Sequence, residues 1–467
     1  MDGLECSEIL FSQIDLCDRF DSDYYTKNYL HISDQMSKVS TEKLGKLATT
    51  VASAFYPAAT QLYSEGDTAF ARCVDCVSYP VITKDQDSKF EKIPYVFAKE
   101  NKGISFVKAD DIIITKVGTP CYASILTDYD EIALSRTVLG LIGIHGIDPY
   151  YLMIFLRCKY GFEQLFRQRE LTIQYQLTLP RVKSIDVYLA DDKLQKAVRI
   201  LCKKSIELQK KSNESYQLAE QLLTEIVKCP DFSTMSTHSI KYIKESFALS
   251  GRLDAEYYQP KYELVTQELN TSETVLALCN LHDKTFVPKD KEVYSYIELA
   301  DVGQMGDISA VDTQYGADLP TRARRIVKSG QIIVSSVEGS LQSCALITDD
   351  YDGALCSNGF YVLDSDKINS ETLLVLFKSE PIQTLMKQRC SGTILTAISK
   401  DELLSMPLPM VDEIIQKEIA AKVQESFALR KQSKQLLEYA KQAVEMAIEQ
   451  SEGVALKWLK DKISVEV

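Results

Sequence analysis

The sequence predicts a mixed α and β fold made of two tandem copies of one unit, each a strand-rich globular domain closed by a long helix. Three observations predict it. The heptapeptide "RFDSDYY" at residues 19–25 returns as "RLDAEYY" at residues 252–258. Longer matches follow it at a nearly constant offset, and each copy ends in an apolar seam of heptad spacing.

The repeat extends well beyond the heptapeptide. "VKADDIIITKVG" at residues 107–118 matches "VKSGQIIVSSVE" at residues 327–338, an offset of 220. Before these matches the copies diverge, because 88 positions separate Arg19 from Val107 and only 75 separate Arg252 from Val327. The matching stretches therefore form a frame that is the same in both copies, and each copy carries a different variable segment on it. This is expected of one scaffold that reads two different targets.

The elements of each copy follow in the same order. β-branched runs within residues 111–118 and 331–339 end at turn residues and predict strands. The apolar stretch 148–169 predicts a helix with Pro149 in its first turn, and in the matching stretch 369–389 Pro381 predicts a break.

A long helix with an apolar heptad seam closes each copy, at residues 194–226 in the first. About 36 residues would span roughly 54 Å, which exceeds one turn of DNA. Small residues at matching seam positions would let two helix backbones approach closely: Ser205 and Ser212, then Ser426 and Ser433. The apolar seam residues are Leu194, Val198, Leu201 and Leu208 in the first helix, and Ile415, Ile419, Leu429 and Leu436 in the second.

The composition is that of a soluble globular protein, with 45% hydrophobic and 25% charged residues among 467. We expect no signal peptide and no membrane span. Twelve scattered cysteines predict reduced thiols and a cytoplasmic location. The net charge of −13 argues against strong non-specific binding of DNA by the isolated chain.

The sequence contains no recognised catalytic signature, because the P-loop, GxGxxG, HExxH and GxSxG patterns are all absent. Cys73 and Cys76 form a lone CxxC, whereas a structural zinc ion needs four ligands. "DPYY" at residues 148–151 is similar to a motif of amino-methyltransferases, but a helix start explains it better. We therefore expect a non-catalytic chain that holds no metal and no cofactor.

The order of these features resembles the specificity (S) subunit of type I restriction-modification enzymes. In that family each recognition domain ends in a pattern of Ile, Leu, two prolines and a Gln that begins the helix. The second copy matches that pattern, whereas the first keeps Gln195 and lacks the prolines. The matching residues of the second copy are Ile398, Leu403, Pro407, Pro409 and Gln416.

The resemblance implies an α+β fold with target-recognition domains at residues 1–190 and 236–410. Spacer helices would occupy residues 191–235 and 411–467, the latter with a C-terminal tail, and would pair as an antiparallel coiled coil with pseudo-two-fold symmetry. Each domain would read one half of an asymmetric, bipartite site in double-stranded DNA. The helices would dock two methyltransferase subunits. The partners, including restriction and translocase subunits, would supply S-adenosylmethionine, ATP and Mg²⁺.

Basic residues near the variable segments are the candidate DNA contacts. Arginine is the preferred reader of guanine edges and also grips phosphate, whereas scattered lysines suit phosphate contacts. An ordinary solvated surface would also explain any one of them. The candidates are Arg322, Arg324, Arg325 and Lys328 in the second copy, and Lys84, Lys89, Lys92, Lys99, Lys102, Lys116 and Arg136 in the first.

Two other functions fit part of the pattern. The long helices would also suit an interaction scaffold whose globular parts bind protein, which the acidic net charge favours. A specificity-like subunit would also serve a defence system with a different effector. Salt-dependent binding of DNA by the assembled complex separates DNA reading from the scaffold alternative.

Overall fold

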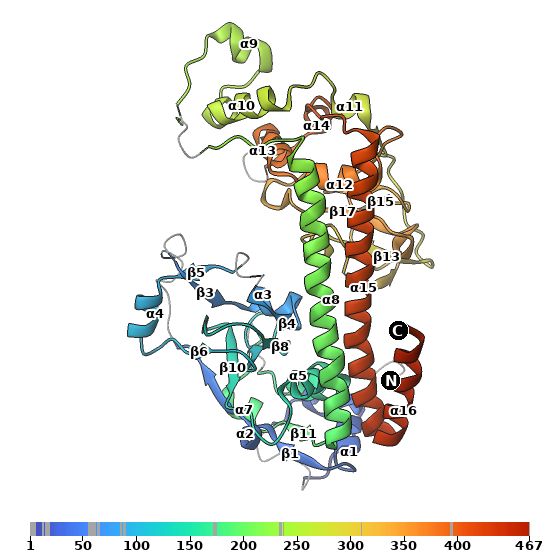
Figure 1. The fold of residues 1–467 in the computed structure, drawn as a ribbon. Helices are drawn as coiled ribbons and strands as arrows, with labels where there is room; N and C mark the ends of the chain where they lie inside the picture. Colours follow the sequence, from blue (N-terminus) through green and yellow to red (C-terminus); the bar gives the residue numbers. More distant parts are fainter. Residues whose placement is uncertain are drawn as a thin grey trace. The chain divides into compact units, whose positions relative to one another are not determined.

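The computed structural model describes residues 6–466 except 12–13, 15–18, 55–61, 63–65, 85, 87–89, 171–174, 233–235, 237, 310 and 393–395. The chain forms two compact units: residues 1–208 with 432–467 (unit 1), and residues 209–431 (unit 2). Each unit contains a globular domain and parts of both long helices, α8 (Asp192–Thr224) and α15 (Glu413–Glu449), green and red in Figure 1. The mixture of small sheets and long helices confirms the α+β class.

Unit 1 contains a five-stranded sheet of order β2-β10-β7-β8-β4, a four-stranded sheet of order β5-β3-β9-β6, and the pair β1-β11. The strands are β1 (Thr41–Lys43), β2 (Thr49–Ala52), β3 (Thr68–Ala71), β4 (Val81–Ile82), β5 (Lys92–Ile93), β6 (Phe106–Val107), β7 (Ile112–Thr115), β8 (Ala123–Leu126), β9 (Ile132–Leu134), β10 (Val138–Ile142) and β11 (Asp186–Tyr188). The helices are α1 (Lys27–Met36), α2 (Leu44–Leu47), α3 (Cys73–Ser78), α4 (Tyr95–Glu100), α5 (Pro149–Arg157), α6 (Lys159–Arg167) and α7 (Leu179–Lys183).

Unit 2 contains two four-stranded sheets, β12-β19-β16-β17 and β14-β13-β18-β15, and the pair β20-β21. The strands are β12 (Asn280–Leu281), β13 (Val293–Ile297), β14 (Thr313–Tyr315), β15 (Ala323–Ile326), β16 (Ile332–Ser335), β17 (Cys344–Leu346), β18 (Leu355–Ser357), β19 (Phe360–Asp364), β20 (Cys390–Ser391) and β21 (Ala397–Ile398). The helices are α9 (Phe247–Ser250), α10 (Pro260–Leu269), α11 (Val275–Leu278), α12 (Ser370–Lys378), α13 (Glu380–Arg389) and α14 (Lys400–Leu404).

The two units share one sheet topology. In unit 1, β7 pairs antiparallel with β8 and β10, as β16 does with β17 and β19 in unit 2. In the second sheet, β3 runs parallel to β9, and β13 runs parallel to β18. The repeat in the sequence is therefore a repeat of the fold.

Most of the difference in length between the two copies lies after the first strand of the sheet, which is β2 in unit 1 and β12 in unit 2, and before Val107 or Val327. From Thr49 in β2 to Val107 the chain advances 58 positions, but from Asn280 in β12 to Val327 it advances only 47. The longer segment of unit 1 contains α3 and β4, and β4 adds a parallel fifth strand beside β8. The two variable segments thus contribute to sheets of the same strand order, β5-β3-β9-β6 and β14-β13-β18-β15, but the elements added around them differ.

The helical stretch after the sheets is broken in both units. Pro381 lies in the first turn of α13, which confirms the predicted break after α12. The single helix expected over residues 148–169 is wrong, because the chain breaks at Cys158 between α5 and α6. Gly161 allows this second break, since a Cβ atom there would lie 2.0 Å from the carbonyl oxygen of Phe155.

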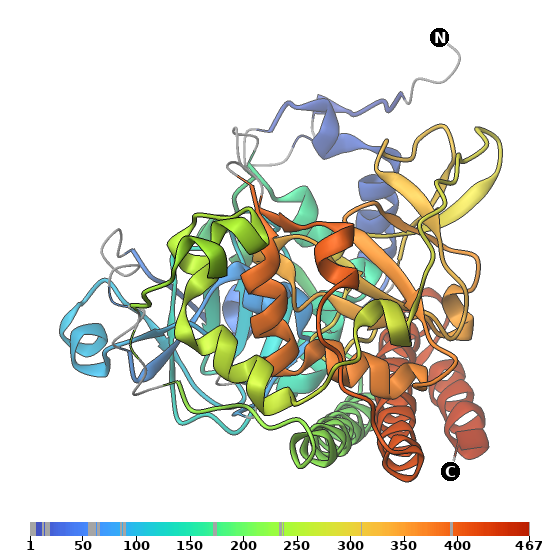
Figure 2. The same cartoon turned by 90° about the horizontal axis from the view of Figure 1, so that it is seen from above.

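The long helices differ slightly from the expectation. α8 ends at Thr224, so Ile226 lies beyond it with 37% of its surface exposed and does not extend the seam. After α15, a further helix, α16 (Glu452–Glu466), turns back within unit 1. The ring of Trp458 in α16 meets that of Tyr439 in α15 edge-on at 5.5 Å, and the two helices lie side by side in Figure 2.

Candidate nucleic-acid interface

The heptapeptide of unit 1 is a structural tether. Arg19 forms a two-pronged ion pair with Asp21, with N–O distances of 2.5 and 2.6 Å, and this lowers the pKa of the carboxyl group. The Arg19 guanidinium also donates to the carbonyl oxygen of Arg169, just after α6, at 3.1 Å. The rings of Tyr24 and Tyr25 meet edge-on at 5.1 Å, and the Tyr25 hydroxyl donates to the Arg19 carbonyl.

Unit 2 repeats this tether with the same residue types of its own heptapeptide. Arg252 pairs with Asp254 through distances of 2.9 and 2.6 Å and donates to the carbonyl oxygen of Cys390 at 3.0 Å. Tyr257 and Tyr258 meet edge-on at 5.0 Å, and the Tyr258 hydroxyl donates to the Arg252 carbonyl. The repeated heptapeptide therefore connects the start of each domain to the chain just after α6 in unit 1 and just after α13 in unit 2. Its role is structural.

A glutamine joins each long helix to its domain. The Gln195 side chain accepts from the backbone N–H of Asp148 at 2.8 Å, and Gln416 accepts from that of Asn369 at the same distance. Asp148 and Asn369 are the N-caps of α5 and α12, so one amide connects two helix starts in each unit. Each glutamine also donates to a carbonyl just before its own long helix.

The two long helices meet through buried serines in both units. In unit 1 the hydroxyl oxygens of Ser205 and Ser433 lie 2.8 Å apart, and each also lies within 3.0 Å of the other residue's carbonyl oxygen. In unit 2 Ser212 and Ser426 repeat the arrangement, with hydroxyl oxygens 3.0 Å apart. These small side chains let the antiparallel backbones approach closely while their hydroxyls remain hydrogen-bonded.

The predicted seam residues pack within the chain. All four of the first helix are buried, and Ile419 and Leu436 of the second are buried as well. Ile415 and Leu429 are half-buried. A partner protein would therefore meet other faces of these helices, where the exposed apolar residues are Ile200, Leu218 and Ile414.

The arginines of the second variable segment lie on and beside β15, an edge strand of its sheet. A β-bulge between Ala323 and Arg325 interrupts its pairing with β18, which changes where the neighbouring side chains point. Arg322 is 57% exposed and pairs with Glu298 at 2.8 Å, a hydrogen bond that raises the pKa of Arg322. Arg324 donates to the carbonyl oxygen of Thr321 at 2.6 Å.

Arg325 has different surroundings from its neighbours. Its guanidinium carbon lies 5.2 Å from the centre of the Tyr361 ring. Its Nη1 atom is buried and has no hydrogen-bond partner among the described residues. Lys328 is exposed at the end of the segment. The structure therefore separates an exposed, paired Arg322 from a half-buried Arg325 that lies over the Tyr361 ring and has one buried donor without a partner among the described residues.

The lysines of the first variable segment are dispersed, and Lys89 lies outside the described residues. Lys84 and Lys102 are exposed, and Lys92, in β5, is half-buried. Lys99 pairs with Glu131 at 2.6 Å, and its ammonium lies 3.9 Å from the centre of the Phe106 ring. Lys92 lies in β5, Lys99 in α4 and Lys102 just after α4, whereas Lys84 follows β4 of the five-stranded sheet.

Lys116 and Arg136 are brought together where β7 pairs with β10: the backbone N–H of Lys116, just after β7, donates to the carbonyl oxygen of Thr137, just before β10, at 2.8 Å. Burial and the neighbouring positive charge of Arg136 lower the pKa of Lys116. Two cations held close together, one half-buried, form the more compact basic site of unit 1.

One buried ion pair was not predicted from the sequence. Arg430 of α15 pairs with Asp307 at 2.6 Å, with 12% and 14% of their side chains exposed, and also donates to Asn213 of α8 at 3.2 Å. Asp307 lies within the variable part of the second domain, so one arginine joins that part to both helices. A lone arginine in a heptad pattern gives no sign of such a partner, because the pairing depends on the fold.

The cysteines of the CxxC lie in α3. The Cys73 thiol donates to the carbonyl oxygen of Thr119 at 3.4 Å, and burial raises the pKa of both Cys73 and Cys76, which disfavours the thiolate that zinc requires. Within the part of the chain that the structure describes, His, Cys, Asp and Glu side chains form no group of three suited to a metal ion. The helices of that same part include none that is long and apolar enough to cross a membrane.

No family model matches the sequence, and no curated protein matches it either. Structural neighbours over most of the chain are subunits of type I restriction-modification systems. The S subunit from M. genitalium has 10% identity over 90% of this chain and 95% of its own, with a TM-score of 0.34. The HsdS subunit from Thermoanaerobacter tengcongensis has 13% identity over 89% and 96%, with a TM-score of 0.26. A chain from a structural study of complex assembly and conformational transition in the type I restriction-modification system has 14% identity. The match covers 86% of this chain and 97% of that chain, with a TM-score of 0.27.

Proposed function

We propose that this chain is the DNA sequence-specificity subunit of a type I restriction-modification system. It reads an asymmetric, bipartite site in double-stranded DNA, one half with each domain. The paired helices set the gap between the two halves. One observation carries the proposal: the same fold is used twice, on the same frame, with two different variable segments.

The contacts that mount the domains are the same in both units, whereas the candidate DNA contacts differ, as this function requires. The tethers, the glutamine links and the buried serines recur at matching positions, so both domains are mounted in the same way. The basic residues differ, with arginines on β15 in unit 2 and lysines in unit 1. Different side chains on equivalent sheets suit different base sequences, which makes the target asymmetric.

The chemistry belongs to partner subunits in this proposal. Two methyltransferase subunits dock on the outward faces of the helices, bind S-adenosylmethionine, flip the target adenine out of the duplex and methylate it. Restriction and translocase subunits that use ATP and Mg²⁺ join the same complex.

A protein-binding scaffold is the second candidate, and the net charge of −13 favours it. In that case the globular domains bind protein surfaces and the helices only join them. A specificity-like subunit with a different effector would share the DNA-reading role and differ only in its partner.

Salt dependence tests the proposal. The chain assembled with its methyltransferase subunits is titrated with duplex DNA at a series of salt concentrations. We expect the logarithm of the binding constant to fall linearly with the logarithm of salt, because phosphate contacts release counterions. An assembled complex that binds DNA weakly and without a salt slope would support the scaffold instead.

A further inference from the structure

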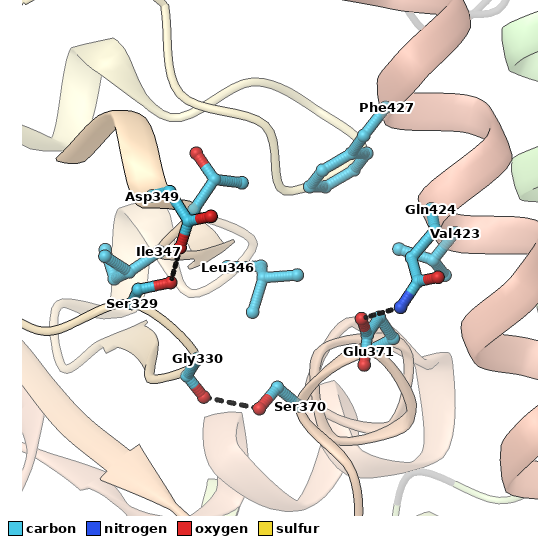
Figure 3. A pocket seen from close by; sticks show the side chains of 11 residues that line it. Ser329, Gly330, Leu346, Ile347, Asp349, Ser370, Glu371, Val423, Gln424 and Phe427 are labelled. Carbon is cyan, nitrogen blue, oxygen red and sulfur yellow. Dashed lines mark hydrogen bonds between the residues drawn. The ribbon is translucent and has the colours of Figure 1, made fainter. Parts of the chain in front are cut away.

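Unit 2 contains a pocket of about 300 Å³ beside α15, where the start of α12 and the end of β17 meet that helix (Figure 3). Two hydrogen bonds between side chains lie at its rim: Gln424 donates to Glu371 at 2.7 Å, and Ser329 donates to Asp349 at 2.5 Å. Its apolar wall is formed by Leu346, Ile347, Val423 and Phe427.

In unit 1 an aromatic side chain of the chain itself stands in the corresponding place. Helices α5 and α12 are both nine residues long and begin at matching positions, which makes Tyr150 the counterpart of Glu371. Tyr150 is only 6% exposed, and burial raises its pKa to about 12. The cationic ends of Arg199 and Lys203 lie 5.5 and 5.9 Å from its ring centre.

The surroundings of Tyr150 identify its site with the pocket. Two electrostatic neighbours of its hydroxyl, Asp110 and Cys202, and one cation over its ring, Lys203, lie at positions that match residues lining the pocket. Asp110 and Gly330 also share the left-handed backbone, with φ of 68° and 83°, so the two turns correspond. Three residues around Tyr150 take the places of three pocket residues: Asp110 for Gly330, Cys202 for Val423, and Lys203 for Gln424.

The charges around the two sites are reversed. In unit 2 the counterparts of Arg199 and Lys203 are Ala420 and Gln424, so both cations are missing. The rim instead carries the carboxylates of Glu371 and Asp349, and none of the residues lining the pocket is basic. An occupant of the pocket must therefore bring both the aromatic ring and the positive charge that unit 1 supplies from its own sequence.

We propose that this pocket is the docking site for an aromatic side chain of a partner protein, a tyrosine or phenylalanine that stands beside a basic residue. The ring replaces Tyr150 against the apolar wall, and the cation meets Glu371 and Asp349. Because unit 1 fills its own site, the partner segment docks on unit 2 only. This inference goes beyond DNA reading and does not depend on it.

The pocket is tested with small probes on the full chain, labelled at Ile, Leu and Val methyl groups for NMR. Tyramine, which joins a phenol ring to an ammonium group, is expected to shift the methyl signals of Leu346, Ile347 and Val423. It is expected to bind up to about fivefold more tightly than 3-(4-hydroxyphenyl)propionate, the matched anion, as one partly exposed charge pair allows. Absence of shifts at 20 mM tyramine in these signals, or tighter binding of the anion, would overturn the proposal.

Two variants that make the same substitution, glutamate to tyrosine, distinguish binding in the pocket from binding elsewhere on the surface. Glu371→Tyr restores the residue of unit 1, so it should fill the pocket and abolish the tyramine shifts. Glu413→Tyr places the same new ring on an exposed position of α15 and should leave them unchanged. Shifts that persist in Glu371→Tyr would place the tyramine elsewhere and overturn the proposal.

Peptides distinguish a protein side chain from a free amine as the occupant. Acetyl-Arg-Tyr-Lys-amide should shift the same three methyl signals as tyramine, and acetyl-Asp-Tyr-Glu-amide should do so several-fold more weakly. Tyramine binding without binding of the basic peptide would make the pocket a small-molecule site and contradict docking of a partner protein.

Discussion

The three arginines around β15 share a sequence motif and differ in their surroundings. Arg322 is exposed and already paired with Glu298. Arg325 is stacked on Tyr361 and keeps an unsatisfied Nη1 donor. An arginine held over an aromatic face loses little side-chain freedom on binding, which favours a directed contact with a base edge through those of its N–H groups that are not buried. An exposed, paired arginine instead favours a contact with phosphate.

Replacing Arg325 by alanine should therefore affect one half-site only. If Arg325 reads a base, the variant should lose about 1–3 kcal/mol of discrimination at one position of the half-site read by the second domain. Competition binding of the assembled complex to a library of altered sites measures this loss position by position.

Arg322→Ala is the matched control on the same segment. It should weaken binding to all sequences alike and reduce the salt slope by about one. An equal loss over all sequences for Arg325→Ala would make Arg325 a phosphate contact as well and contradict its separate role.

At the scale of elements, the buried serines fix how closely the helices approach. Ser433 and Ser205 are almost fully buried, and no larger side chain would fit between the backbones without pushing them apart. Ser433→Leu should lower the free energy of unfolding by about 1–3 kcal/mol, because overpacking forces shifts in side chains and backbone.

The neighbouring residue supplies the control. Gln432 is exposed on the same helix, so Gln432→Leu should change the unfolding free energy by less than about 0.5 kcal/mol. Chemical denaturation of the three proteins compares them directly. Equal stability of Ser433→Leu and the parent chain would mean that the helices are not held in close contact.

The length of the paired helices tests whether they set the gap between the two half-sites. Four residues inserted into α8 between Ser205 and Ser212, with four inserted into α15 between Ser426 and Ser433, lengthen the paired helices by about 6 Å. We expect a changed gap between the half-sites, or loss of activity, with the bases read in each half unaltered. Mapping of the modified sites measures the gap, and an unchanged gap at full activity would contradict the helices as a ruler.

Much of this element structure could be predicted from the sequence. The β-branched runs became β7 and β16, Pro381 marked a real helix break, and the heptapeptides proved to be structural. The break at Cys158 was missed because its cause is a close backbone contact at Gly161, which no local pattern reveals. The pair of Arg430 and Asp307 was missed for a similar reason, since 123 positions separate the two residues.

The candidate DNA contacts could be predicted as a set and not individually. Sequence places Arg322 and Arg325 three residues apart and treats them alike. The bulge in β15 and the ring of Tyr361 make them different, and both depend on strands that are distant in sequence.

At the scale of the whole molecule, charge limits what the chain does alone. The 53 lysines and arginines are outnumbered by 66 acidic residues, which gives a net charge of −13 that repels DNA, and some of the candidate contacts are neutralised by pairs such as Lys99 with Glu131. The purified chain should therefore bind duplex DNA poorly at about 0.15 M salt, and binding should strengthen when the methyltransferase subunits assemble on it. Gel-shift titration of the chain and of the complex checks this. Tight binding by the chain alone would show that its local basic surfaces outweigh its net charge.

A map of DNA modification tests the central claim most directly. The chain is expressed with the methyltransferase subunit of its own system in a host without adenine methylation, and the DNA is sequenced with detection of modified bases. The account predicts a two-part, asymmetric motif with a fixed gap, modified once on each strand. Unmodified DNA from cells in which the two proteins still purify together would contradict it and would favour the interaction scaffold.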